Sequence, residues 1–271
     1  MRLLFLGDLV GRAGRRAVSD HLPAVQQALK PDLTIANVEN AAAGFGLTRK
    51  IMTDLFDKGV DVQTSGNHIF DQREIMAVMG EERRLLRPAT FPKGAPGFGH
   101  GLYKTVRGKT VLVINLMGRV YMDAMGDPFA VADEILTQYR MGNTVDAVFV
   151  DFHGEATSEK MALGHHLDGR VSFVVGTHTH VPTADTQILP GGTGLQCDAG
   201  MCGDYNSVIG MQKDEPVRRF LQKTPGKRFE PANGDPTLCG VFVETDDKTG
   251  HAINVAPVRQ GGSLLPQMPD F

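Results

Sequence analysis

Short apolar runs and helical stripes alternate along the first half of the chain. Three mostly apolar runs predict buried strands at residues 3–6, 33–38 and 60–64. Each run is followed by a segment with apolar residues at helical spacing, and these segments predict helices at residues 14–30, 48–58 and 71–79. A strand, a loop and a helix repeated three times are typical of a parallel sheet covered by helices. The first half therefore predicts an α/β fold.

The second half of the chain is richer in strand pairs. Asp127-Pro128 is typical of a helix start, and the pattern after it predicts a helix that ends at Arg140. Two hairpins and two further apolar runs predict strands within residues 102–115, 145–150, 171–176 and 237–258. No linker divides the chain. We therefore expect a second sheet packed on the first, in a single domain over residues 1–271.

Composition excludes several functional classes. The chain has 271 residues, a net charge of −3 and no run of basic residues longer than a pair, so a large binding surface for duplex nucleic acid is not expected. No apolar run approaches the length needed to cross a membrane. The cysteines are odd in number and lack C-x-x-C spacing, which is typical of reduced thiols and predicts a cytoplasmic protein.

Polar side chains with metal-binding chemistry follow the predicted strands. Parallel strands bring their carboxyl ends to one edge of a sheet, so these side chains are expected to meet there. The set consists of Asp8, Glu39, Asn40, Asn67, His68, His153, His178 and His180. His178 and His180 are two residues apart, and in an extended chain both imidazoles would point to the same side.

The ligand types suit a divalent transition metal. Carboxylate, carboxamide and imidazole groups bind manganese, iron or zinc, and the absence of thiolates argues against a structural zinc site. The candidates exceed the four ligands of one tetrahedral ion, so we expect two metals that share a carboxylate. Other interpretations stay open for single members: Asp8 as a helix N-cap, Asn67 as a turn residue and His153 as a core histidine. His165 and His166 lie in a predicted helix outside the series and are interpreted as surface residues.

Taken together, the motifs resemble those of the calcineurin-type metallophosphoesterases. The usual series reads D-x-H, G-D, G-N-H-D/E, H and G-H-x-H, and Gly66-Asn67-His68 with the 176–180 segment follows it closely. Two positions depart from the series: Val10 replaces the first histidine, and Glu39-Asn40 replaces Gly-Asp. In these departures the chain resembles the YmdB-like bacterial phosphodiesterases, over residues 3–258.

The resemblance implies a four-layer α/β/β/α sandwich and an enzyme that hydrolyses phosphate esters, with 2′,3′-cyclic nucleotides as the small-molecule substrates. It implies two ions, of iron or manganese with zinc also suitable. One ion would be held by Asp8, Glu39 and His180, with Asn40 near the place of the missing histidine. The other would be held by Glu39, Asn67, His153 and His178. A hydroxide bridging the ions would attack phosphorus, and His68 would be the general acid. The number of subunits stays open, and a homo-oligomer is compatible with the sequence.

Two rival interpretations concern the first loop and the class of protein. A dinucleotide-binding loop at residues 7–14 is disfavoured, because its glycine spacing is not G-x-G-x-x-G and Asp8 would face a pyrophosphate. A regulatory protein that binds RNA or a partner protein, with a residual metal site, remains the alternative to an enzyme. Residues 198–206 are interpreted either as a glycine-rich loop that contacts substrate or as a tight turn that needs positive φ.

Overall fold

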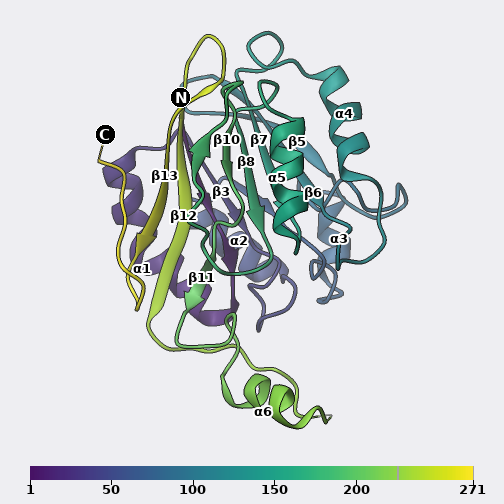
Figure 1. Cartoon of the computed structure of the whole chain (residues 1–271), viewed down its shortest axis with the longest axis vertical. Helices are drawn as coiled ribbons and strands as arrows, with labels where there is room; N and C mark the ends of the chain where they lie inside the picture. Colours follow the sequence, from purple (N-terminus) through teal and green to yellow (C-terminus); the bar gives the residue numbers. More distant parts are fainter. Residues whose placement is uncertain (225, 271) are drawn as a thin grey trace.

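Two β-sheets lie face to face in the computed structural model, which describes residues 1–224 and 226–270 (Figure 1). The first sheet has the order β2-β11-β12-β1-β3-β4, and β13 pairs with the other side of β12. Strands β1, β3 and β4 are parallel, whereas β12 runs antiparallel to β1, β11 and β13. The bounds are β1 Arg2–Leu6, β2 Asp8–Leu9, β3 Leu33–Asn37, β4 Val62–Thr64, β11 Met201–Asp204, β12 Pro236–Thr245 and β13 Ala252–Gln260.

The second sheet has the order β5-β6-β7-β8-β10-β9. Its central strands β6, β7, β8 and β10 are parallel, and the hairpin partners β5 and β9 are antiparallel edge strands. The bounds are β5 His100–Lys104, β6 Thr110–Met117, β7 Ala147–His153, β8 Phe173–Thr177, β9 Gln187–Ile188 and β10 Gly194–Gln196. The predicted hairpin over residues 102–115 is thus present as β5 and β6.

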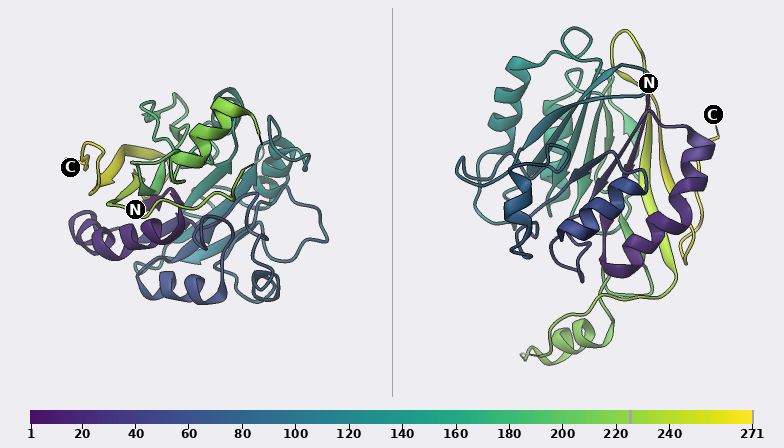
Figure 2. Two further views of the ribbon diagram at one scale, coloured as in Figure 1. Left: turned by 90° about the horizontal axis from the view of Figure 1, so that it is seen from below. Right: turned by 180° about the vertical axis from the view of Figure 1, so that it is seen from behind.

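Helices cover the outer face of each sheet, which gives four layers (Figure 2). Apolar side chains of α1, α2 and α3 pack on the first sheet, and those of α4 and α5 pack on the second. The bounds are α1 Gly11–Leu29, α2 Arg49–Asp57, α3 Ile75–Met79, α4 Pro128–Gln138, α5 Thr157–His166 and α6 Asp214–Gln222. The predicted α/β/β/α sandwich is confirmed. Figure 1 shows α6 standing away from the four layers, at the end opposite the two termini.

The alternation of side chains along β1 explains why both faces of the first sheet are apolar. Leu3 and Phe5 point into the space between the sheets, whereas Leu4 and Leu6 pack under the helices. Phe5 stacks on Phe149 of β7 with ring centroids 5.4 Å apart, which joins the two sheets. Among the described residues, no helix is long and apolar enough to cross a membrane.

Several element boundaries differ from the sequence prediction. Helix α1 begins at Gly11, three residues earlier than predicted, because a positive φ of 57° at this glycine lets the chain turn directly from β2 into the helix. The N-cap is Val10, so the interpretation of Asp8 as a helix cap is wrong. Residues 201–204 form the buried strand β11, so residues 198–206 are not a free substrate loop. Gly200 has the positive φ that the tight-turn interpretation required.

Candidate metal and phosphate site

The predicted site residues meet where strands of both sheets end. Asp8 lies in β2, and Glu39 and Asn67 follow β3 and β4 of the first sheet. His153 is the last residue of β7, and His178 follows β8 in the second sheet. The edge between the sheets therefore brings together residues that are far apart in the sequence, such as Asp8 and His178, which are 170 positions apart.

Glu39, His153 and His178 form the centre of the site. Nε2 of His153 lies 3.1 Å from Oε1 of Glu39 and 3.1 Å from Nδ1 of His178. One ligand atom from each of the three side chains lies within 4.8 Å of the others, a spacing that suits one metal ion. Asn67 joins this group, because its Oδ1 lies 3.0 Å from the same nitrogen of His153. These are the four residues expected to hold one ion.

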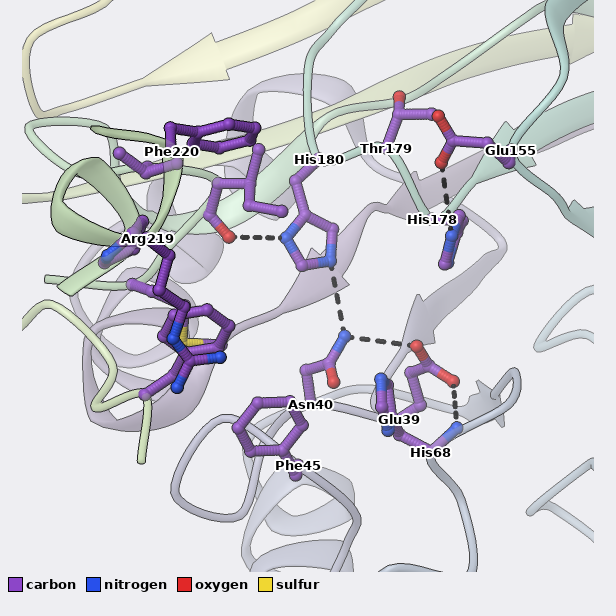
Figure 3. Close-up of a pocket in the computed structure, with 15 residues that line it drawn as sticks. Glu39, Asn40, Phe45, His68, Glu155, His178, Thr179, His180, Arg219 and Phe220 are labelled. Atoms are coloured by element: carbon purple, nitrogen blue, oxygen red, sulfur yellow. Dashed lines mark hydrogen bonds and ion pairs between the residues drawn. The ribbon is translucent and has the colours of Figure 1, made fainter. Parts of the chain in front are cut away.

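Asn40 contacts the same oxygen of Glu39 that faces His153, and its side chain also lies beside His180. The Asn40 side chain donates to Oε1 of Glu39 at 3.1 Å and lies 3.3 Å from Nε2 of His180 (Figure 3). Asp8 is fully buried, and its Oδ1 is 3.8 Å from Nε2 of His180. Glu39 thus stands between two groups of potential ligands, as a shared carboxylate would.

One buried oxygen of Asp8 indicates that the site fits a cation. Its Oδ1 has no hydrogen-bond partner among the described residues, although an unpaired buried carboxylate oxygen is costly. The other oxygen, Oδ2, accepts the backbone N–H of His178 at 3.1 Å. A metal ion would satisfy the free oxygen. The donor set of carboxylate, amide and imidazole groups has the chemistry that such an ion requires.

The electrostatics of the buried cluster favour positive charge. Burial alone would raise the pKa of Glu39, but the neighbouring His153 and His68 lower it to about 2. Burial would lower the pKa of His153, but the carboxylates of Glu39 and Asp8 raise it to about 9. Burial and the nearby His153 lower the pKa of His178 to about 3. Glu39 therefore remains ionised and stabilises a cation beside it, whereas burial raises the pKa of Asp8.

A second layer of hydrogen bonds orients the imidazoles. Nδ1 of His153 lies 2.9 Å from Thr177 Oγ1, and this hydroxyl donates to Asp151 at 2.7 Å, which leaves Nε2 of His153 free to bind a metal. Nδ1 of His180 lies 2.8 Å from the Ile209 carbonyl, so its Nε2 points toward Asn40 and the site. Asp151 follows an apolar run in the sequence. Its buried contacts were not predicted, because they join two strands that only the fold brings together.

The backbone around His178 and His180 differs from the prediction. Their φ angles are 99° and 65°, so the segment is not extended and the i, i+2 argument is wrong. Both side chains still line the same cavity, because the chain coils after Thr177. Thr179 stabilises this coil by donating from its backbone and its hydroxyl to Asp198, which also accepts from Lys160.

His68 faces the cavity from the side of the first sheet. Its backbone N–H donates to Oε2 of Glu39 at 2.9 Å, and its Nδ1 lies 2.8 Å from Oδ2 of Asp71. Phe45 contacts the His68 ring edge-on, with centroids 5.0 Å apart. Asp71, three residues further along the chain, holds the tautomer with a proton on Nδ1. This partner was not predicted, although a carboxylate three residues after His68 was a usable signal.

A cavity of about 550 Å³ opens above these residues. One part of its wall carries the polar groups, including Glu39, His68 and His178. The other part is apolar and comes from Phe45 and from a segment in which no element was predicted. The apolar lining residues of this segment are Val208, Ile209, Met211, Pro216, Phe220 and Phe229. That segment holds α6, whose polar composition hid it.

Other candidate residues lie away from the cavity or have a different role. Val10 is fully buried in an apolar cluster with Met201 and Met211, which explains why this position does not carry a histidine. His165 and His166 are exposed on α5, as expected, and His166 pairs with Asp133.

Comparison with known proteins gives the evolutionary context of this geometry. The family model described as YmdB-like protein matches residues 4–258. A 2′,3′-cyclic-nucleotide 2′-phosphodiesterase of Bacillus subtilis is 46% identical over 255 residues, which cover 94% of this chain and 95% of the relative. A hypothetical protein from Thermus thermophilus is 41% identical with a TM-score of 0.90, covering 97% of this chain and 100% of that structure. A novel phosphatase from Mycoplasma pneumoniae is 33% identical with a TM-score of 0.89, covering 96% and 93%.

Proposed function

Because the chain belongs to the YmdB-like protein family, we propose that it is a metal-dependent phosphodiesterase that acts on nucleoside 2′,3′-cyclic phosphates. Membership of a family with phosphodiesterase and phosphatase relatives makes it a phosphoester hydrolase, as the sequence predicted. The single observation that carries the metal-dependent part is the free buried Oδ1 of Asp8 beside the Glu39–His153–His178 cluster. We also propose a cytoplasmic location, which is supported by three buried cysteines without disulfide bonds.

The donor set supports two ions of iron or manganese, with zinc also compatible. Glu39, Asn67, His153 and His178 would hold one ion, and Asp8, Glu39 and His180 the other, with Asn40 placed between Glu39 and His180. When bound, the ions would neutralise the phosphate and activate a water molecule for attack on phosphorus.

The side chains of the protein orient the substrate and supply a proton to the leaving oxygen. Hydrolysis of the cyclic diester breaks the bond between phosphorus and the 2′ oxygen, and that oxygen must gain a proton as it leaves. We assign this proton to Nε2 of the imidazolium form of His68, because the ring lines the cavity and its Nδ1–H donates to Asp71. After the transfer, the neutral ring keeps the Nδ1 proton. Imidazole exchanges protons near neutral pH, so it suits this role.

The test is turnover of adenosine 2′,3′-cyclic phosphate by purified protein loaded with manganese or iron. We expect hydrolysis to the 3′-nucleotide that is lost on chelation and restored by metal. His165→Ala is a matched control, because this histidine is exposed on α5 and should leave the rate unchanged. Absence of turnover in protein that contains both metals would contradict the proposal and favour the regulatory RNA- or protein-binding alternative.

A further inference from the structure

We propose that the segment around α6 forms a subsite for the nucleobase of the substrate, with Phe220 as its main stacking surface. This inference rests on the proposed function and adds how the substrate is selected. We call residues 212–224 and 226–230 the α6 arm. The arm stands outside the four layers, yet Arg219, Phe220 and Phe229 on it line the same cavity as the metal-binding side chains (Figures 1 and 3).

The cavity has a polar wall and an apolar wall. The polar side carries the carboxylate and imidazole groups, which suit a phosphate and its counter-ions. The opposite side is lined by large apolar side chains, which a phosphate group does not need. They are Phe45, Val208, Ile209, Met211, Phe220 and Phe229. A phosphate at the polar wall and an apolar group at the opposite wall would therefore suit this cavity.

The base of the α6 arm fixes its direction. Met211 and Pro231 form an antiparallel bridge, and the backbone N–H of Gln212 donates to the Glu230 carbonyl at 2.8 Å. Met211 also packs in the buried cluster with Val10, beneath the site. The arm therefore leaves the body of the protein as a paired double segment, and its lining residues are presented toward the cavity.

Within the α6 arm, one aromatic ring is covered and one is free. The guanidinium of Arg219 lies 3.9 Å from the centroid of Phe229, and its Nε donates to Glu215 at 2.8 Å. Phe220, by contrast, is 83% exposed although it lines the cavity. An exposed phenylalanine beside a phosphate site is a surface on which a nucleobase stacks, because every base has a flat π-face.

The geometry favours a nucleobase over an acyl chain. The Arg219 guanidinium already lies over the Phe229 ring in the wall, and Phe45 adds another aromatic group near His68. Flat rings and a guanidinium plane match a planar base. Asn40 and Thr179 also line the cavity, so polar groups are available to the sugar.

The experiment compares two cyclic diesters with the same reactive five-membered ring. Adenosine 2′,3′-cyclic phosphate carries a base, and glycerol 1,2-cyclic phosphate does not. In metal-loaded protein, we expect Phe220→Ala to raise the KM for the adenosine compound about tenfold and to leave kcat within about twofold. The preference for the adenosine compound should therefore fall about tenfold, while Phe220→Tyr should restore it.

Leu221→Ala is the matched control. Leu221 is the next residue on α6 and is 80% exposed, but it does not line the cavity, so its removal should leave both substrates unaffected. The inference is overturned if Phe220→Ala keeps the wild-type preference, if it slows both diesters equally, or if Leu221→Ala has the same effect.

Failure of the proposed function is distinguishable from failure of the subsite. If wild-type protein hydrolyses neither diester, binding of adenosine 3′-phosphate is measured by calorimetry instead. Binding that is about tenfold weaker in Phe220→Ala than in wild type, and unchanged in Leu221→Ala, supports the subsite without any turnover. Equal binding by all three proteins overturns it.

Discussion

His68 is the side chain whose proposed role is most sensitive to the nature of the substrate. A general acid matters when the leaving group is a poor one, such as the 2′ oxygen of ribose. We expect His68→Ala to slow hydrolysis of adenosine 2′,3′-cyclic phosphate on the order of 10²–10⁴-fold. The loss should be much smaller for a nitrophenyl phosphodiester, whose leaving group needs little protonation.

Rates on both esters and the metal content of each protein provide the measurement. Asp71→Asn keeps the shape of the contact but removes its charge, so it should produce the same pattern in weaker form. Equal losses on both esters, with both metals retained, would show that His68 positions the phosphate and does not supply a proton.

Gly66 is a position where the site leaves no space for any side chain. A Cβ at this residue would lie 2.3 Å from Nε2 of His153 and 2.5 Å from Oε2 of Glu39. We expect Gly66→Ala to displace these ligands, to reduce metal content and to cost about 1–3 kcal/mol of stability. Gly80→Ala is the matched control, because nothing lies within 4 Å of a Cβ there. Metal content equal to wild type in Gly66→Ala would contradict the central role of this pair of ligands.

Helix α5 contributes to the site through one buried ion pair. Nζ of Lys160 lies 2.8 Å from Asp198, and both side chains are almost fully buried. The same carboxylate holds Thr179, between the two histidines. We expect Lys160→Met to cost about 3–5 kcal/mol, because it leaves Asp198 buried without its partner.

Lys160→Met should also bind metal more weakly than wild type. Metal titration and thermal unfolding of both proteins measure the two effects. Lys58→Met removes a lysine from the partly exposed i, i+4 pair with Asp54 and should cost less than about 1 kcal/mol. If Lys160→Met unfolds like wild type and keeps its metal affinity, the pair has no positioning role.

The comparison of elements shows which parts of the fold a sequence can predict. Strands β1 and β3 and helix α4 follow from local apolar patterns and caps, so their positions were predicted to within a few residues. Helix α6 was missed, because its only buried residue is Pro216 and it has no apolar face against the sheets. Strand β11 was missed because its glycine and cysteine residues resemble a loop. Its burial depends on β2 and β12, which are distant in the sequence.

In the site, too, residues placed by local sequence patterns were predicted, whereas residues placed by distant contacts were not. The residues that follow β3, β4, β7 and β8 were predicted, because parallel strands necessarily bring their carboxyl ends together. Their roles as ligands and as general acid remain predictions. Glu155 and the arm residues were not predicted, because their contacts depend on loop conformations that leave no periodic signal. Asp71 was also not predicted, although it lies three residues after His68. Glu155, for example, reaches Nε2 of His178 at 3.3 Å only because the chain coils at positive φ.

Bound metal is expected to stabilise the whole molecule against unfolding. Asp8, Glu39 and Asn67 come from the first sheet, whereas His153 and His178 come from the second. Ions held by both groups would link the two sheets at one edge. Bound ligand stabilises the folded state by about 2.7 kcal/mol at a free concentration one hundred times its dissociation constant. For a chain of this size, that corresponds to a rise in Tm of roughly 5–10 °C.

Thermal unfolding with and without manganese measures this effect. Glu39→Ala should bind neither ion and show no rise, because its carboxylate lies between the two groups of ligands. Glu39→Gln keeps the shape and should show a smaller rise than wild type. His165→Ala should behave as wild type, since this histidine is exposed on α5. Retention of two ions and of the full rise in Tm by Glu39→Ala would contradict both the bridge and the link between the sheets.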